Sequence, residues 1–436
     1  MVNPNIFCNV PWTNMHVYWD GSFGMCCSES SKIYNDSEKE KHNLSKMTAS
    51  KWFNSVPMQN IRQSMHGSQK ISACSQCYQQ ENFGYESRRI KENFKSVIFT
   101  ELGFEKSYQQ SPWHTRFENS KENGLTDNIP IDWHIDLGSE CNYACKMCSA
   151  EASSKIASLL KKHGKYNGKI VSNWTDDPVA YANFFQSIDE TNIKRIHFMG
   201  GEPTVSKKFF EIIDRLLEKN RTEISLSFVT NGTNLNDELI NKLKKFANID
   251  IEISIESLYI NNDYIRQGCN IEKLIKTLLH LKSQQDDKLQ IVLRTVPQLL
   301  SIYTYPELIE WAYDNNFIIE GIPLSEPDYL QTQLLPEDIK QHIIKKFKLV
   351  KDKINNGKTF NKIQNGRSLG TLNEKLVREC DAMIKICSEP LPVNHEELNK
   401  KLIKNLLFWD KIYNLDALQI FPQYKEWLEK LNYARS

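Results

Sequence analysis

The spacing of hydrophobic and polar positions changes at about residue 130 of this 436-residue chain. Beyond that point, short apolar or alternating runs are separated by longer runs in which apolar residues recur every three or four positions. The short runs are typical of β-strands and the longer ones of amphipathic helices. This alternation predicts an α/β domain with a parallel sheet. The strand-like runs cover residues 131–138, 193–203, 224–232, 249–257, 289–296 and 317–324.

One face of these strands is polar. In the run 249–257, isoleucine occupies every second position, and the positions between are Asp250, Glu252, Ser254 and Glu256. A parallel sheet covered by helices on both faces is apolar almost throughout, and a closed eight-stranded barrel fills its interior with branched apolar side chains. We therefore expect a partial (β/α)6 barrel whose lumen holds a ligand. The alternative is a sheet with one solvated face.

The pattern divides the chain into three expected regions. Residues 1–100 are rich in turn-forming residues and cysteine, with helical signals at 50–65 and 85–99. Residues 129–330 form the partial barrel, and residues 331–436 read as a helical C-terminal extension.

Composition and charge limit the partners and the compartment that we expect for the protein. The chain is 40% hydrophobic and 25% charged, with 55 basic against 54 acidic residues, so no global basic field favours nucleic acid or an anionic membrane. No signal peptide is evident at the N-terminus, and no run approaches the ~20 apolar residues that span a bilayer. We expect a cytoplasmic protein without membrane contact.

Cysteine clustering is the strongest chemical signal. Three of the 11 cysteines, Cys141, Cys145 and Cys148, follow the first strand with C-x3-C-x2-C spacing. Three close thiolates suit an iron–sulfur cluster or part of a zinc site. A structural zinc site needs a fourth ligand, and this segment offers none. Three thiolates on a four-iron cluster would leave one iron open.

Two further motifs complete a resemblance. "GGEP" (200–203) ends the second strand and "TNG" (230–232) ends the third. With the cysteine triad, these motifs resemble the radical S-adenosylmethionine (SAM) superfamily over about residues 130–325. The resemblance implies a SAM-binding [4Fe-4S] cluster on the three cysteines, with SAM on the open iron. The residues it places around SAM are Met147, Gly200, Gly201, Glu202, Pro203, Thr230, Asn231, Ser254, Glu256 and Arg294.

Two of these assignments depart from the pattern or have an alternative. The residue before the third cluster cysteine is often aromatic in the family, whereas here it is Met147, a soft side chain that can still pack on adenine. Arg294 can pair bidentately with the SAM carboxylate. Alternatively, it forms an ion pair inside the lumen with Glu252 or Glu256.

The N-terminal cysteines suggest a second metal site. Cys8, Gly21 and Cys26 form C-x12-G-x4-C, followed by the pair Cys74 and Cys77. This resembles the auxiliary-cluster module called SPASM or its shorter form, twitch, and implies a second [4Fe-4S] cluster on the four cysteines. One set of ligands favours twitch. The module precedes the barrel here, although it usually follows it, and a four-cysteine zinc site is the alternative. Cys27 could replace Cys26 as a ligand, but only Cys26 has the glycine at the offset of the pattern, so Cys27 has no other assigned role.

The family resemblance implies reductive cleavage of SAM to a 5′-deoxyadenosyl radical, which abstracts hydrogen from a substrate. The electron would come from a donor such as flavodoxin or ferredoxin. The substrate expected is a peptide or protein, or alternatively a small sugar-like or nucleotide molecule. Arg266 and Cys269, just after the fourth strand, are candidate catalytic residues, with an ion pair and a buried thiol as alternatives. A non-catalytic metal-binding scaffold is the rival from another class.

Overall fold

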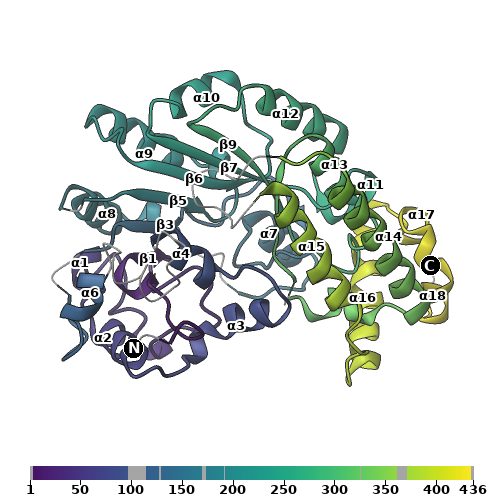
Figure 1. Ribbon diagram of the computed structural model, residues 1–436, viewed down its shortest axis with the longest axis horizontal. Helices are drawn as coiled ribbons and strands as arrows, with labels where there is room; N and C mark the ends of the chain where they lie inside the picture. The colour runs from purple at the N-terminus through teal and green to yellow at the C-terminus, as the bar shows by residue number, and fades with distance from the viewer. Residues whose placement is uncertain are drawn as a thin grey trace.

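An eight-stranded sheet runs through the centre of the molecule, in the order β10-β9-β7-β6-β5-β3-β1-β2 (Figure 1). The computed structural model describes residues 3–96, 114–126, 129–168, 173–190, 192–324, 326–360 and 371–433. Six strands are parallel neighbours and coincide with the six predicted runs. They are β3 (Asp132–Asp136), β5 (Arg195–Met199), β6 (Ser225–Thr230), β7 (Asn248–Ser254), β9 (Leu289–Thr295) and β10 (Ile318–Gly321). The sheet stays open between β10 and β2, so the predicted α/β fold with a partial barrel is confirmed.

The register of the strands aligns their polar side chains in layers. His134 on β3 lies opposite His197 on β5, which lies opposite Ser227 on β6. The residues that precede them in each strand, Trp133, Ile196 and Leu226, are buried in the hydrophobic core. Because successive side chains point to opposite faces of a strand, the predicted polar inner face follows directly from this register.

Helices cover the outer face of the sheet, as Figure 1 shows for α8, α9, α10 and α12. Each presents an apolar stripe to the strands, and the cap residues Asn236 and Asn270 accept backbone N–H groups at the starts of α10 and α12. The helices are α8 (Pro178–Glu190), α9 (Lys207–Glu218), α10 (Asp237–Leu243), α11 (Ile260–Ile265), α12 (Ile271–Ser283) and α13 (Tyr305–Asp314).

The N-terminal region contributes a strand to the barrel sheet, which the sequence did not indicate. Strands β1 (Asn14–Val17) and β2 (Phe23–Gly24) form a hairpin around the Asp20–Gly21 turn, where Gly21 has a φ of 79°. Strand β1 then pairs in parallel with β3, placing His16 opposite His134. The N-terminal region and the barrel therefore share one continuous sheet.

Short helices complete the N-terminal region. The predicted helix 50–65 is two helices, α1 (Ala49–Phe53) and α2 (Val56–His66), with Pro57 in the first turn of the second. Helix α3 (Ser75–Asn82) follows. The predicted helix 85–99 begins at Arg88 as α4 (Arg88–Ser96), and residues 97–99 lie outside the described residues. Helix α6 (His114–Asn119) lies beside α1 and α2 (Figure 1).

The C-terminal region is helical, as predicted. It contains α14 (Glu337–Asn356), α15 (Leu372–Cys387), α16 (His395–Tyr413), α17 (Ala417–Ile420) and α18 (Lys425–Lys430). Helix α15 packs against β10, α13 and α14, and its cysteines, Cys380 and Cys387, are buried in the core. Helices α16 to α18 lie on the opposite side of the molecule from α1 and α2 (Figure 1).

Candidate functional site

The cysteine triad lies in the loop that follows β3, at the carboxyl end of the parallel strands. Its middle part forms β4 (Ala144–Cys145), which pairs antiparallel with β8 (Arg266–Gln267). Cys145 is buried, Cys141 is half-buried and Cys148 is exposed. The carboxyl edge of a parallel α/β sheet is where such folds bind ligands.

The two glycines of GGEP let the second strand's loop approach this cysteine loop closely. Gly201 donates its backbone N–H to the Gly138 carbonyl at 2.8 Å, and Glu202 donates to the Glu140 carbonyl at 2.7 Å. A Cβ atom on Gly201 would lie 2.1 Å from the Glu140 oxygen, and Gly200 has a φ of 115°. A side chain at Gly201 would collide with the cysteine loop, and the backbone conformation of Gly200 is one that favours glycine.

Glu202 connects GGEP to TNG. Its buried carboxylate accepts hydrogen bonds from the Thr204 backbone and hydroxyl, from the Thr230 hydroxyl at 2.7 Å and from the Asn231 N–H at 2.6 Å. Asn231 in turn donates to Asn142, inside the cysteine loop, at 2.6 Å. The motifs at the ends of β5 and β6 therefore hold each other and the cysteine loop in place.

A buried ion pair completes this end of the sheet. Glu256, directly beyond β7, accepts from Arg266 at 2.5 Å and 3.1 Å and from the Val296 N–H at 2.9 Å. Arg266 Nη1 lies 3.7 Å from Cys145 Sγ. Burial raises the pKa of Glu256, opposed by Arg266; burial alone would lower the pKa of Arg266, but Glu256 and Cys145 raise it. The pair places a fixed cation beside the triad.

The lumen contains a cavity of about 190 Å³. Its wall is polar and carries charges of both signs, several of them paired across neighbouring elements. Arg294 lies 2.7 Å from Glu320 and 3.6 Å from Glu252, and Lys91 of α4 lies 3.0 Å from Glu320. Side chains from the inner faces of the strands that line it include His134, His197, Ser227, Glu252, Arg294 and Glu320.

The N-terminal region supplies the other wall of this cavity. Cys27 and Arg88 line it, and the Arg88 guanidinium contacts both Cys27 Sγ and the ring nitrogens of His134, at 2.7 Å to Nε2. Burial and the neighbouring Arg88 charge lower the pKa of His134. His197 bonds to Ser227 at 2.7 Å, and burial lowers its pKa to about 3. Both imidazoles are therefore neutral near pH 7.

The four predicted auxiliary cysteines all lie in the N-terminal region that carries Cys27. Cys8, Cys26, Cys74 and Cys77 are all buried. Burial raises the pKa of the Cys8 thiol, and the nearby Cys74 and Cys77 raise it further. The neighbouring Cys27 thiol and burial raise the pKa of Cys26, and Cys77 raises it further. Buried thiols in one region suit a metal or an iron–sulfur cluster.

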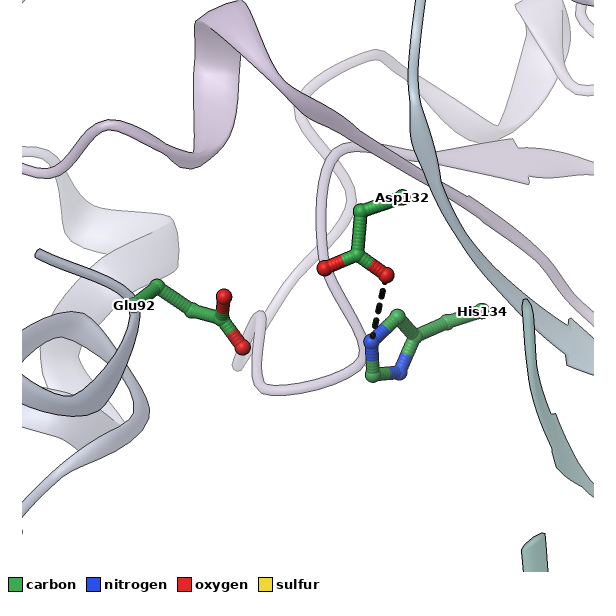
Figure 2. Close-up of side chains that lie close together, drawn as sticks. All are labelled: Glu92, Asp132 and His134. Atoms are coloured by element: carbon green, nitrogen blue, oxygen red, sulfur yellow. Dashed lines mark ion pairs between the residues drawn. The ribbon is translucent and has the colours of Figure 1, made fainter. Parts of the chain in front are cut away.

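Glu92, Asp132 and His134 also lie close together, with Asp132 and His134 3.7 Å apart (Figure 2). Arginines already neutralise this group. Arg195 bonds to Asp132 Oδ1 at 2.9 Å and to Glu92 at 2.9 Å, and Arg88 contacts His134. Two guanidinium groups at this distance disfavour a metal ion, so we interpret the group as the anchor of α4 on the floor of the barrel.

Comparison with known proteins agrees with this geometry. Residues 135–296 match the family described as the radical SAM superfamily, and residues 8–78 match SPASM, an iron–sulfur cluster-binding domain. The chain therefore carries a domain of the radical SAM superfamily. Its cofactors are accordingly SAM with the [4Fe-4S] cluster of the radical SAM domain, and the auxiliary iron–sulfur cluster of the SPASM domain.

Similarity to individual radical SAM proteins is partial. The chain is 29% identical over 160 residues to the radical SAM cyclopropyl synthase TigE of Paramaledivibacter caminithermalis, covering 34% of this chain and 32% of TigE. It is 24% identical over 175 residues to the mycofactocin maturase MftC of Mycobacterium ulcerans, covering 39% and 42%. These matches thus span less than half of each relative. SAM-bound SuiB of Streptococcus suis overlaps 67% of this chain and 62% of its own, with 15% identity and a TM-score of 0.37.

The remaining predicted positions of the radical SAM site differ in their surroundings. Arg294 lies 3.6 Å from Glu252, one of its two alternative partners, and pairs more closely with Glu320; Ser254 is its register neighbour. Met147 is half-buried against the core, and Pro203 starts a short 3-10 helix. Cys269 does not line the cavity; burial raises its pKa to about 12, and Asn262 Nδ2 lies 3.3 Å from its sulfur.

The sequence reasoning missed the N-terminal side of the radical SAM lumen. Cys27, Arg88 and Lys91 line the cavity, and His16 on β1 lies 3.3 Å from Asp136 on β3. The only available signal was the position of Cys27 next to Cys26, at a turn in which the Glu29 N–H donates to the Cys26 carbonyl at 3.3 Å. Among the described residues, no helix is long and apolar enough to cross a membrane.

Proposed function

We propose that this chain cleaves SAM reductively and abstracts hydrogen from a peptide or protein substrate held in the lumen. We assign Cys141, Cys145 and Cys148 as ligands of the SAM-binding cluster. When bound, SAM and the reduced cluster supply a 5′-deoxyadenosyl radical, the species that attacks an unactivated carbon. A small electron carrier such as flavodoxin or ferredoxin is the proposed donor.

One observation carries this proposal. The cysteine loop, GGEP, TNG and the Glu256–Arg266 pair come from four different strand ends, and the last three each contact the cysteine loop directly. The hydrogen bonds of Glu202 and Asn231 fix the loop against two neighbouring strands. A loop held in this way presents its thiols at a fixed site, and rigid support of ligands is what a metal centre needs.

The residues around the triad have distinct proposed roles. Arg266 offsets the negative charge of the thiolates, and Glu256 holds Arg266 in position. The backbone of Gly200 and Gly201 faces the start of the cysteine loop, where we place the SAM amino group. Glu202 serves to hold the loops rather than to bind SAM directly, because four hydrogen bonds already occupy its carboxylate. Arg266 and Cys269 stay our candidates for a direct effect on the reaction.

For the auxiliary site we assign Cys8, Cys26, Cys74 and Cys77 as ligands. Four thiolates complete the coordination of a [4Fe-4S] cluster, so electron transfer or shaping of the cavity is its proposed role. Cys27 points to the cavity and bonds to Arg88 instead. The proposal of a peptide substrate is supported by one relative, which is named as a maturase.

Anaerobic reconstitution with iron, sulfide, SAM and a strong reductant tests the proposal. We expect both 5′-deoxyadenosine and methionine from the wild-type protein, and neither from Cys145→Ala. Cys387→Ala, which alters a thiol buried in α15 far along the chain from the triad, should still produce both. Absence of both products from a wild-type protein that carries its iron would refute the proposed activity.

A further inference from the structure

A second hollow of about 150 Å³ opens from the lumen cavity. It lies between α3 of the N-terminal region and the segment that follows β10. Gln76 and Gln80, one helical turn apart on α3, line both the cavity and this hollow. On the barrel side, Ile322 lines the cavity and its neighbour Pro323 lines the hollow. The two spaces therefore adjoin, and we call the second one the amide groove.

Primary amides dominate the polar lining of the amide groove. Helix α3 contributes three of them, and the opposite wall, around the 3-10 helix Thr332–Leu334, contributes two. Within the described part of the chain, none of these five side-chain amides forms a hydrogen bond to protein, although all are at least partly exposed. They are Gln76, Gln79, Gln80, Gln331 and Gln333.

Among the described residues no charged side chain lines the amide groove, and apart from Thr332 the rest of its wall is apolar. Phe83, Leu324 and Ile386 supply large apolar surfaces between the amides. A smaller hollow beside the cavity, the charged opening, differs in both respects. It is only about 20 Å³, and Glu86, Lys375 and Arg378 line it, with Arg378 2.9 Å from Glu86. Of these two hollows beside the cavity, the amide groove is the larger and the one that described charged side chains do not line.

The chemistry of the amide groove selects a class of ligand. Each glutamine offers two N–H donors and a carbonyl acceptor, which match the alternating carbonyl and N–H groups of an extended peptide. Free phosphates and nucleic acid need cations, which the groove lacks. Apolar patches between the amides suit the side chains of such a peptide, as in other strand-like recognition modes.

We propose that the amide groove binds an extended peptide segment through its main chain and leads one residue of it into the lumen. This inference rests on the proposed peptide-modifying function and names how the substrate enters. Main-chain recognition has a specific consequence. Binding should tolerate changes in peptide side chains but not the removal of peptide N–H groups.

Photo-crosslinking tests this proposal on the cluster-loaded protein with SAM and without reductant. The probe is a library of ten-residue peptides of mixed sequence, N-acetylated and C-amidated, each carrying one benzophenone side chain. We expect cross-links at residues 76–83 and 323–333. The same peptides with methylated backbone nitrogens should compete at least about tenfold less well, since each lost hydrogen bond weakens binding.

Variants assign the binding to the amides. Gln79→Ala with Gln331→Ala should lower the cross-linking yield about tenfold, and Gln419→Ala, an exposed glutamine on α17, should leave it unchanged. Cross-links at the charged opening or scattered over the surface, equal competition by methylated peptides, or no labelling would each overturn the proposal. SAM cleavage measured on the same preparation separates the two claims, because the cross-linking needs no turnover.

Discussion

The pair Glu256–Arg266 shows how a single buried contact can support a metal site. The Glu256 side chain is fully buried, and Arg266 is also buried, so each loses its hydration. Such a pair adds little net stability, but removing one partner leaves an uncompensated charge inside the protein. At this site that charge would also lie beside Cys145.

Glu256→Gln should therefore destabilise the protein strongly. We expect the free energy of unfolding in urea to fall by about 3 kcal/mol, the range for breaking a buried pair. Glu223→Gln, in an exposed pair with Arg221, should change it by less than about 1 kcal/mol. Equal effects of the two substitutions would contradict the role assigned to the buried pair.

The lumen histidines make stability depend on pH. The pKa of His197 in the folded protein is about 3, because of burial, whereas the imidazole of an unfolded chain has a pKa near 6.5. Between these values the unfolded state binds more protons, so acid favours unfolding. The contribution of His197 is complete above pH 6.5 and is lost as the pH falls below it.

His197→Asn should remove this dependence. Relative to the variant, the wild type should lose about 1.4 kcal/mol of unfolding free energy per pH unit, or about 2 kcal/mol between pH 6.5 and pH 5. Urea unfolding at a series of pH values measures the difference. Parallel pH profiles for the two proteins would show that His197 is protonated in the fold.

At the scale of elements, local pattern was sufficient for the six barrel strands and insufficient for β1. Strands β3 and β7 alternate polar and apolar residues over five and seven positions, and helices separate the six barrel strands. Strand β1 has four residues, all buried, and pairs with a strand 118 positions away, from Asn14 to Asp132. No local signal encodes a partner so distant in the chain, so the link between hairpin and barrel could not be predicted.

Helix α16 is the element that supports the cysteine loop from outside. Trp409 packs with Ala144 of β4 and Ile156 of α7 (Ser154–Lys162), and its neighbour Asp410 accepts from Tyr264 at 2.8 Å. Lys146, within the loop, lies over the Tyr264 ring, 3.7 Å from its centroid. The C-terminal extension thus forms part of the site's framework.

Trp409→Ala should reveal this support. Truncating a buried tryptophan costs about 3–5 kcal/mol, and here the loss falls on the cysteine loop. We expect a lower urea midpoint and faster proteolysis near residues 141–150. Leu349→Ala on α14, where the side chain is 60% exposed, should have little effect on either. A Trp409→Ala protein as stable as wild type would contradict the support of the cysteine loop by α16.

For the whole molecule, motifs predicted one half of the site and the fold created the other half. The triad, GGEP and TNG each follow a strand whose pattern is local, so their convergence could be expected from a parallel sheet. Cys27 and Arg88 reach the lumen only because β1 joins the sheet and α4 packs across it. Sequence distance hides such contacts.

This arrangement places the lumen cavity between two sets of thiols. Met199, which immediately precedes GGEP, lines the cavity on the barrel side, and Cys27, which immediately follows Cys26, lines it on the other. A substrate in the cavity would therefore lie between the SAM site and the auxiliary site. We propose that these are two independent iron–sulfur sites.

The iron content of anaerobically reconstituted protein distinguishes two iron–sulfur sites from one. Two [4Fe-4S] clusters predict about eight irons per chain in the wild type and about four in either Cys145→Ala or Cys26→Ala. Cys27→Ala should keep about eight, because its thiol faces the cavity. Zinc in place of iron at the N-terminal cysteines, or a Cys26→Ala protein that retains every iron, would contradict a second iron–sulfur site at these cysteines.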